Sequence, residues 1–201
     1  LEVQFLGLEE AKEQVYGSLD EVYSAYDQHY HIEDYRKIDL LLATALSNNT
    51  PDKNVWLMFV GASGVGKSMM TNPLNHVELE GREIAHMTSD ITTNTIVSGQ
   101  GGRETDLAPD LDGRIMYVPD MSTVVGKRSE DQREIFAQLR NLYDGKAKKE
   151  TGSHGQNPEY EVDVTFVGNV TPAIFSKQLI HQDMGTRFLY YEINDFNKEE
   201  E

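Results

Sequence analysis

The sequence predicts an α/β fold of three layers, in which helices cover both faces of a parallel five-stranded sheet. Three observations carry this prediction. Residues 54–60 form an apolar run typical of a parallel strand that is buried on both faces. A glycine-rich turn and a segment of helical periodicity follow it directly. Two later apolar runs lead to Asp120 and Asn169, and a helical pattern over residues 129–142 separates them; such alternation is typical of parallel sheets.

The glycine-rich turn, residues 61–68, fits the pattern G-x-x-x-x-G-K-[ST], which binds phosphate groups. Its glycines allow a tight turn whose backbone N–H groups point inward at phosphate oxygens. In this pattern Lys67 reaches the β- and γ-phosphates of a nucleotide, and the Ser68 hydroxyl holds Mg²⁺. The predicted phosphate-binding residues are Gly61, Ala62, Ser63, Gly64, Val65, Gly66, Lys67, Ser68 and Met69.

Residues 113–120 form a second motif, an apolar strand that ends in an acid. If this strand neighbours the first one, Asp120 lies where it can hold Mg²⁺ through water, as in the Walker B pattern. Most ATP hydrolases of this type place a glutamate next as the general base, but Met121 occupies that position here. Three alternatives stay open: Asp120 serves both roles, Glu130 or Asp131 supplies the base, or hydrolysis is slow.

Three more strands complete the predicted sheet. Residues 83–87 are a short candidate. Residues 160–170 form a core strand with Asn169 at its tip, where a polar side chain can orient the attacking water or sense the γ-phosphate. Residues 185–193 form the last strand, with Arg187 at its entrance.

Residues 143–158 combine turn-forming residues with a cluster of lysines, and we expect a hairpin-like insertion. The lysines are Lys146, Lys148 and Lys149. In so acidic a chain, a local lysine cluster could contact nucleic-acid phosphates. The alternative is a solvated loop without a binding role.

The N-terminal part is expected to precede the core. Residues 1–7 resemble an engineered protease-cleavage site with Leu and Gln exchanged, so we expect a cloning remnant outside the fold. Residues 8–50 carry apolar side chains at three- and four-residue steps and are expected to form helices. Residues 51–201 then form the core, with a further short helix over residues 92–97 after polar cap residues.

Composition excludes several classes of protein. The 201 residues include 18 Lys and Arg against 34 Asp and Glu, and the net charge of −16 argues against non-specific coating of DNA or of anionic membranes. The chain has no cysteine, which excludes a disulfide framework and thiolate metal sites. No apolar run reaches the roughly 18 residues of a membrane helix, and no signal peptide is visible. We therefore expect a cytoplasmic protein without a membrane partner.

Taken in order, the two motifs, the Asn-tipped strand and the Arg-led last strand resemble the core of AAA+ ATPases. The segments Gln-Leu-Arg-x-x-Tyr-Asp-Gly, Val-Thr-Pro-Ala-Ile and Arg-Phe-Leu-Tyr-Tyr are similar to those of P-loop ATPases from phages and other mobile elements. These ATPases are often described as helicase- or primase-associated. The chain is similar, more distantly, to bacterial enhancer-binding ATPases. The resemblance covers residues 35–193.

The resemblance implies ATP and Mg²⁺ as cofactors, a strand order of 5-1-4-3-2, and catalytic roles for Lys67, Asp120, Asn169 and Arg187. Asn169 is similar to sensor 1, and Arg187 to an arginine finger that acts on ATP held by a neighbouring subunit. The resemblance also implies a ring-shaped homo-oligomer, such as a hexamer, that works as a motor in DNA replication or remodelling of a phage or mobile element. The helical lid that usually follows the last strand is expected to be absent.

Two other functions stay open. One is a nucleotide-dependent switch or protein-remodelling module with little turnover and no DNA contact, which the acidic composition and Met121 favour. The other is a small-molecule kinase, a class that needs several arginines around the transferred phosphate; Arg103, Arg114 and Arg128 are the central candidates. The sequence has no guanine-reading Asn-Lys-x-Asp segment, which disfavours a GTPase.

Overall fold

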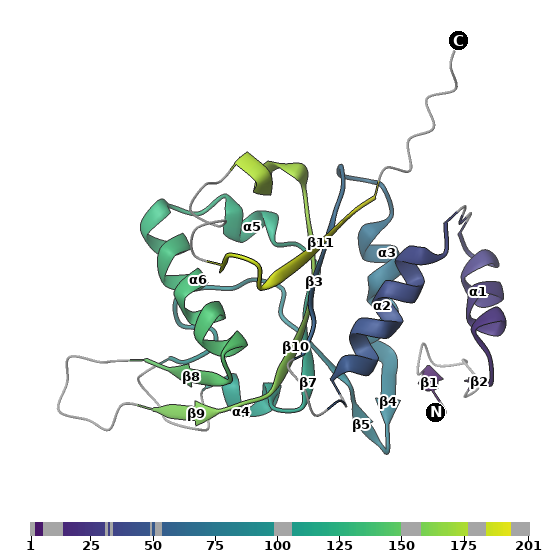
Figure 1. Ribbon diagram of the computed structural model, residues 1–201, viewed down its shortest axis with the longest axis horizontal. Coiled ribbons are helices and arrows are strands. Elements are labelled where there is room, and N and C mark those ends of the chain that lie inside the picture. Colours follow the sequence, from purple (N-terminus) through teal and green to yellow (C-terminus); the bar gives the residue numbers. More distant parts are fainter. Residues whose placement is uncertain are drawn as a thin grey trace, which may run out of the picture.

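A parallel sheet of five strands forms the centre of the computed structural model (Figure 1). The structure describes residues 3–5, 14–30, 32, 34–48, 50, 54–98, 106–149, 158–176 and 184–193. The sheet consists of β3 (Trp56–Val60), β6 (Ala85–Met87), β7 (Arg114–Val118), β10 (Val164–Val170) and β11 (Phe188–Glu192). The strands lie in the order β11-β3-β10-β7-β6. If only these five strands are numbered in chain order, their order in the sheet is 5-1-4-3-2, as expected. Their labels have higher numbers because the short strands of the other sheets are also counted.

Helices cover both faces of this sheet, which confirms the predicted three-layer α/β architecture. α2 (Arg36–Ser47) and α3 (Lys67–Thr71) lie on one face, and α5 (Ser122–Val125) and α6 (Ser129–Tyr143) lie on the other (Figure 1). The helix predicted over residues 129–142 is therefore present and one residue longer. Its buried apolar side chains are Ile135, Phe136, Leu139 and Leu142.

The central strand β3 packs against both helical layers. Trp56, Met58 and Val60 belong to the hydrophobic cluster on the α5 and α6 side. Leu57 and Phe59 belong to the cluster on the α2 and α3 side. Successive side chains of a strand point to opposite faces, so a continuous apolar run is what burial on both faces requires. Because β3 is buried on both faces, all of its side chains are apolar, and the sequence therefore predicts this strand clearly.

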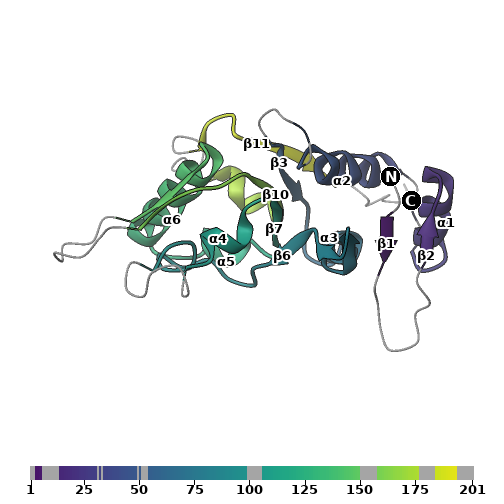
Figure 2. The same ribbon diagram turned by 90° about the horizontal axis from the view of Figure 1, so that it is seen from below.

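The N-terminal helix is shorter than the sequence predicts. α1 (Leu19–Asp27) begins after Ser18, whose Oγ accepts a hydrogen bond from the Glu21 backbone N–H at 3.4 Å. Views in two directions place α1 outside α2, further from the sheet (Figures 1 and 2). β2 (Gln14–Tyr16) is extended, so the helical prediction is wrong there, because pairing with β1 (Val3–Phe5) supplies its backbone hydrogen bonds. Residues 8–13 lie outside the described residues.

A second, antiparallel sheet joins the N-terminal residues to the core. Its order is β2-β1-β4-β5, where β1 spans Val3–Phe5, β4 spans Val77–Leu79 and β5 spans Arg82–Glu83. In the register of β1 and β4, Gln4 lies opposite Glu78. Residues 3–5, which were expected to lie outside the fold, thus pair with a strand of the core. The strand predicted over residues 83–87 is divided, because β5 ends at Glu83 and β6 begins at Ala85.

The helix predicted over residues 92–97 is absent, and turns take its place. The Thr92 backbone N–H donates to Thr95 Oγ1 at 2.8 Å, and such local side-chain bonds compete with a helix. Ile96 nevertheless reaches the core, and its carbonyl accepts from Ala108 N at 3.0 Å. α4 (Ala108–Leu111) follows and leads into β7.

The remaining short elements flank the strand ends. A 3₁₀ helix (Asn72–His76) continues α3, and another (Pro172–Ser176) follows β10. β8 (Lys146–Lys148) and β9 (Glu159–Glu161) form the expected hairpin, whose tip lies outside the described residues. The hairpin lies at the end of the molecule opposite α1 (Figure 1). In the part of the chain that the structure describes, no helix has the length and apolarity needed to cross a membrane.

We expect Trp56→Ala to lower the free energy of unfolding by about 3–5 kcal/mol, because it leaves a cavity in the core. Trp56 is 1% exposed, its Nε1 donates to the Val164 carbonyl at 2.7 Å, and its ring stacks on Phe166 at 5.0 Å. Urea denaturation followed by far-UV circular dichroism measures the loss. Leu189→Ala on β11, at a side chain that is 54% exposed, is the control and should change stability by less than about 0.5 kcal/mol. Equal losses would contradict this packing.

Candidate phosphate-binding site

β10 lies between β3 and β7 and is parallel to both, so the strand that leads to Asp120 is not the direct neighbour of β3 that was expected. The carboxyl ends of all three strands nevertheless meet at one edge of the sheet, because the strands are parallel. The loop of residues 61–66 leaves β3 at this edge. Hydrogen bonds fix its start: Gly61 N donates to the Val170 carbonyl at 3.1 Å, and Ile193 N donates to the Val60 carbonyl at 2.7 Å. The predicted phosphate-binding loop therefore begins at a defined position between β10 and β11.

The loop's glycines are required for different physical reasons. Gly64 and Gly66 have φ angles of +87° and +81°, a region that side chains disfavour. A Cβ added at either would meet nothing within 4 Å, so open space surrounds this part of the loop. At Gly61 a Cβ would lie 2.9 Å from Val65 Cγ2 and 3.2 Å from the Ile193 carbonyl oxygen, so crowding excludes a side chain there.

Lys67 lies over its own loop. Its Nζ donates to the carbonyl oxygens of Gly61 and Ala62, each at 2.7 Å. Partial burial lowers the pKa of Lys67, and the charge of Asp120 opposes that shift. A phosphate group would offer the ammonium stronger, charged acceptors than two carbonyls. The lysine is thus at the loop and near an acid, as the motif requires.

Ser68 and Asp120 come together at this edge. The exposed Ser68 hydroxyl lies 3.5 Å from the Pro119 carbonyl oxygen, directly before Asp120. Asp120 is also exposed, and its Oδ1 accepts from Ser122 N at 2.8 Å. Hydroxyl and carboxylate oxygens are ligands that Mg²⁺ uses together with nucleotide phosphates and water. Among the described residues no three His, Asp or Glu side chains gather into a metal site, so a cation here would also need oxygens from the nucleotide.

The residue after Asp120 faces away from this edge. Met121 is fully buried and belongs to the cluster on the α5 and α6 side. Its backbone N donates to the Asn169 carbonyl at 2.7 Å, which fixes that direction. The position at which most P-loop ATP hydrolases carry a glutamate therefore belongs to the core of this chain. Glu130 and Asp131 lie in the first turn of α6.

Asn169 belongs to a buried hydrogen-bond network that the sequence does not reveal. It is 1% exposed, and its Nδ2 donates to Thr71 Oγ1 at 2.8 Å. Thr71 Oγ1 in turn lies 2.8 Å from the Tyr117 hydroxyl, which donates to Asn72 Oδ1 at 2.8 Å. Burial raises the pKa of Tyr117, although its bonds to Thr71 and Asn169 oppose the shift. Asn169 Oδ1 is buried without a partner among the described residues.

Arg187 lies at the opposite edge of the sheet. The register pairs Phe188 with Trp56 and Glu192 with Val60, so the strand length, about 16 Å for five residues, separates Arg187 from the phosphate-binding loop. Its guanidinium makes an ion pair with Asp144 at 3.2 Å and lies 5.6 Å from the centre of the Tyr143 ring. The structure therefore does not bring Arg187 together with Lys67 and Asp120 in one chain.

The three hairpin lysines do not form an isolated basic patch. Lys146 lies opposite Glu161, and Lys148 lies opposite Glu159. Lys149 Nζ donates to the Thr93 carbonyl at 2.7 Å and lies 3.4 Å from Glu134 Oε1. Opposite charges on paired strand positions offset one another, so the charge available for a polyanion is reduced.

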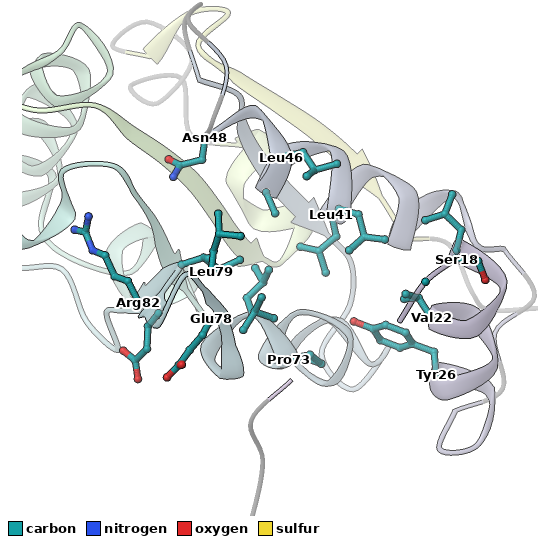
Figure 3. Close-up of a pocket in the computed structure, with 18 of the residues that line it drawn as sticks. Ser18, Val22, Tyr26, Leu41, Leu46, Asn48, Pro73, Glu78, Leu79 and Arg82 are labelled. Carbon is teal, nitrogen blue, oxygen red and sulfur yellow. The ribbon is translucent and has the colours of Figure 1, made fainter. Parts of the chain in front are cut away.

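A cavity of about 380 Å³ lies elsewhere, between α1, α2 and the β4–β5 hairpin (Figure 3). Val22, Tyr26 and Leu41 contribute apolar walls, and Asn48 and Arg82 lie at one end. None of the described residues that line it belongs to the phosphate-binding loop. It is therefore separate from the candidate site.

Comparisons with known proteins give structural similarity alone. No protein-family model and no curated protein sequence matches the chain. Among solved structures, NtrX from Brucella abortus in complex with ATP is similar, with a TM-score of 0.49 and 14% sequence identity over 87% of this chain. The same protein in complex with ADP gives a TM-score of 0.48 at 14% identity over 87% of this chain. In both cases the match spans only 41% of the NtrX chain.

Proposed function

We propose that the chain is an Mg²⁺-dependent ATP-binding and ATP-hydrolysing module of the AAA+ type. The observation that carries this proposal is the arrangement at one sheet edge. An open glycine loop holds Lys67, and Ser68 lies beside the backbone that precedes Asp120. Asn169 lies on the strand between β3 and β7. Lys67 would bind phosphate, Ser68 and Asp120 would hold Mg²⁺, and Mg²⁺ would offset the charge that develops during phosphoryl transfer.

We expect Lys67→Ala to abolish ATP binding, since it removes the cation that meets the β- and γ-phosphates. Isothermal titration with ATP and Mg²⁺ measures the affinity. Lys146→Ala is the matched control, because it removes the same charge from the exposed surface of the hairpin. Unchanged affinity in the Lys67 variant would show that the loop does not bind nucleotide.

Arg187 supports a further part of the proposal, a ring-shaped homo-oligomer such as a hexamer. The strand length separates this arginine from its own phosphate-binding loop, so it could reach only the nucleotide of a neighbouring copy. Asp144 and Tyr143 hold its guanidinium at the surface of the opposite edge. An arginine supplied in this way can contribute about 10³–10⁵ to the rate of phosphoryl transfer.

Mixing two inactive variants tests this arrangement. Neither Arg187→Ala nor Lys67→Ala alone should turn over ATP. In mixed oligomers, an intact Arg187 from the Lys67 variant can meet an intact loop from the Arg187 variant, so partial turnover should return. Native mass spectrometry verifies that the two chains mix. A verified mixed oligomer without recovered turnover would exclude an arginine that acts between copies.

Two functions are compatible with such an ATPase module: a motor that acts on DNA, and a module that does not contact DNA. The resemblance to mobile-element ATPases favours a DNA motor, in which Lys146, Lys148 and Lys149 would contact the DNA phosphates. The pairing of these lysines with glutamates favours the second candidate, a switch or protein-remodelling module without DNA contact. The net charge of −16 favours the same candidate.

ATP turnover measured against protein concentration, with and without single- and double-stranded DNA, separates these targets. For the second candidate we expect tight ATP binding with little turnover at every concentration, unchanged by DNA. DNA stimulation that disappears when all three hairpin lysines are replaced by alanine would instead support the DNA motor. Arg133→Ala removes one exposed positive charge from α6, against three in the hairpin variant, and shows whether a surface cation outside the hairpin affects the response to DNA.

A further inference from the structure

ATP hydrolysis needs a group that accepts a proton from the attacking water, and the usual position for that group is occupied by the buried Met121. We propose that Asp90 supplies this carboxylate. The inference rests on the proposed ATPase function and identifies the missing base of that same site.

The sheet register places Asp90 at the correct edge. β6 runs parallel to β7, with Met87 opposite Tyr117. Thr88 N donates to the Tyr117 carbonyl at 2.8 Å, which continues the pairing beyond the end of β6. Asp90 follows Met87 by three residues, and Asp120 follows Tyr117 by three residues. The two acids therefore leave adjacent parallel strands at the same edge.

Contacts with Thr123 connect the two acids. Thr123 Oγ1 lies 3.3 Å from Asp90 Oδ1 and 3.1 Å from the Asp120 carbonyl oxygen. The Thr123 hydroxyl, which has one hydrogen to donate, thus lies within hydrogen-bond distance of both the Asp90 carboxylate and the backbone that carries the expected Mg²⁺ ligand. Its side chain is 45% exposed, so water can reach it.

Lys127 orients the carboxylate. Its Nζ lies 3.1 Å from Asp90 Oδ2, while Thr123 contacts Oδ1, so each oxygen has one partner from the segment that follows β7. A carboxylate oxygen has room for more than one hydrogen bond, so each can still accept one from water.

The other acids near this edge are less suitable. Asp120 Oδ1 is engaged by Ser122 N, and its carboxylate is expected to serve Mg²⁺. Glu130 and Asp131 belong to α6, after the turn that follows α5. Within the described part of the chain, neither makes a hydrogen bond or ion pair with Asp120 or Thr123. Glu192 ends β11 opposite Val60, on the side of β3 away from β7. Of these acids, Asp90 is the one that shares a contact residue, Thr123, with the backbone of Asp120.

In the proposed step, Asp90 accepts the proton that the attacking water loses. The water oxygen forms a bond to the γ-phosphorus, and the bond between this phosphorus and the β,γ-bridging oxygen breaks. ADP leaves with that electron pair, inorganic phosphate forms, and Asp90 returns its proton to solvent. No other reactant is needed.

Asp90→Asn in the full chain tests the assignment, because it keeps the size of the side chain and an acceptor for Thr123 but removes the basic oxygen. We expect turnover to fall by about 10²–10⁴-fold, the usual contribution of a general base. Titration should show that ATP affinity is retained. After incubation with ATP and acid quenching, chromatography should find ATP bound to the variant and ADP bound to the unchanged protein. Circular dichroism checks that the variant is folded.

Asp110→Asn, an equal charge change in α4 before β7, should leave turnover unchanged. Glu130→Gln tests the competing acid and should retain turnover. If Asp90→Asn hydrolyses ATP at the rate of the unchanged protein, or if Glu130→Gln alone abolishes hydrolysis, the assignment is overturned while the ATPase proposal stands. An unchanged protein that binds ATP and never hydrolyses it also overturns the assignment. Failure of the unchanged protein to bind ATP overturns both.

Discussion

Burial of β3 on both faces is the constraint on which the other features depend. Its five residues are all buried, and its backbone is hydrogen-bonded in parallel to β10 and to β11. A strand in this position needs a covering layer on each face, which α2 and α6 supply. Because its neighbours are parallel, their carboxyl ends gather at one edge. The hydrogen bond from Gly61 N to the Val170 carbonyl continues the parallel pairing into the first residue of the predicted phosphate-binding loop.

The opposite edge of the same sheet is held by aromatic packing. The Trp56 ring lies 5.4 Å from both Tyr143 and Phe188, so the end of α6 and the start of β11 are fixed together. This cluster supports Arg187 and its ion pair with Asp144. The edge at the carboxyl ends of the strands thus carries Lys67, Ser68 and Asp120, which are suited to phosphate and metal. The opposite edge carries the guanidinium of Arg187. The parallel arrangement of the strands separates the two.

Sequence reasoning was most successful where structure is determined locally. The loop at residues 61–68 and the continuous burial of β3 follow from patterns within ten residues. The strand order, by contrast, was implied by the resemblance to AAA+ ATPases. Sequence reasoning failed where hydrogen-bond partners are remote. Nothing near Thr71 indicates its bond to Asn169, 98 residues later, and nothing near Asp90 indicates Thr123, 33 residues later. It also failed at residues 14–16, because apolar spacing alone does not show that β1 pairs with them.

The burial of Met121 has a consequence for how such a site can change by mutation. Its Cγ lies 3.4 Å from the position that a Cβ on Gly168 would occupy, inside the layer between the sheet and α5. A glutamate introduced there would carry an unpaired charge into that layer, at a cost of several kcal/mol. Met121→Glu, which would restore the usual acid-glutamate pair of ATP hydrolases, would therefore reduce stability without adding a base at the sheet edge. Residue 121 and its core neighbours must change together, so the effect of a substitution at this position depends on its background.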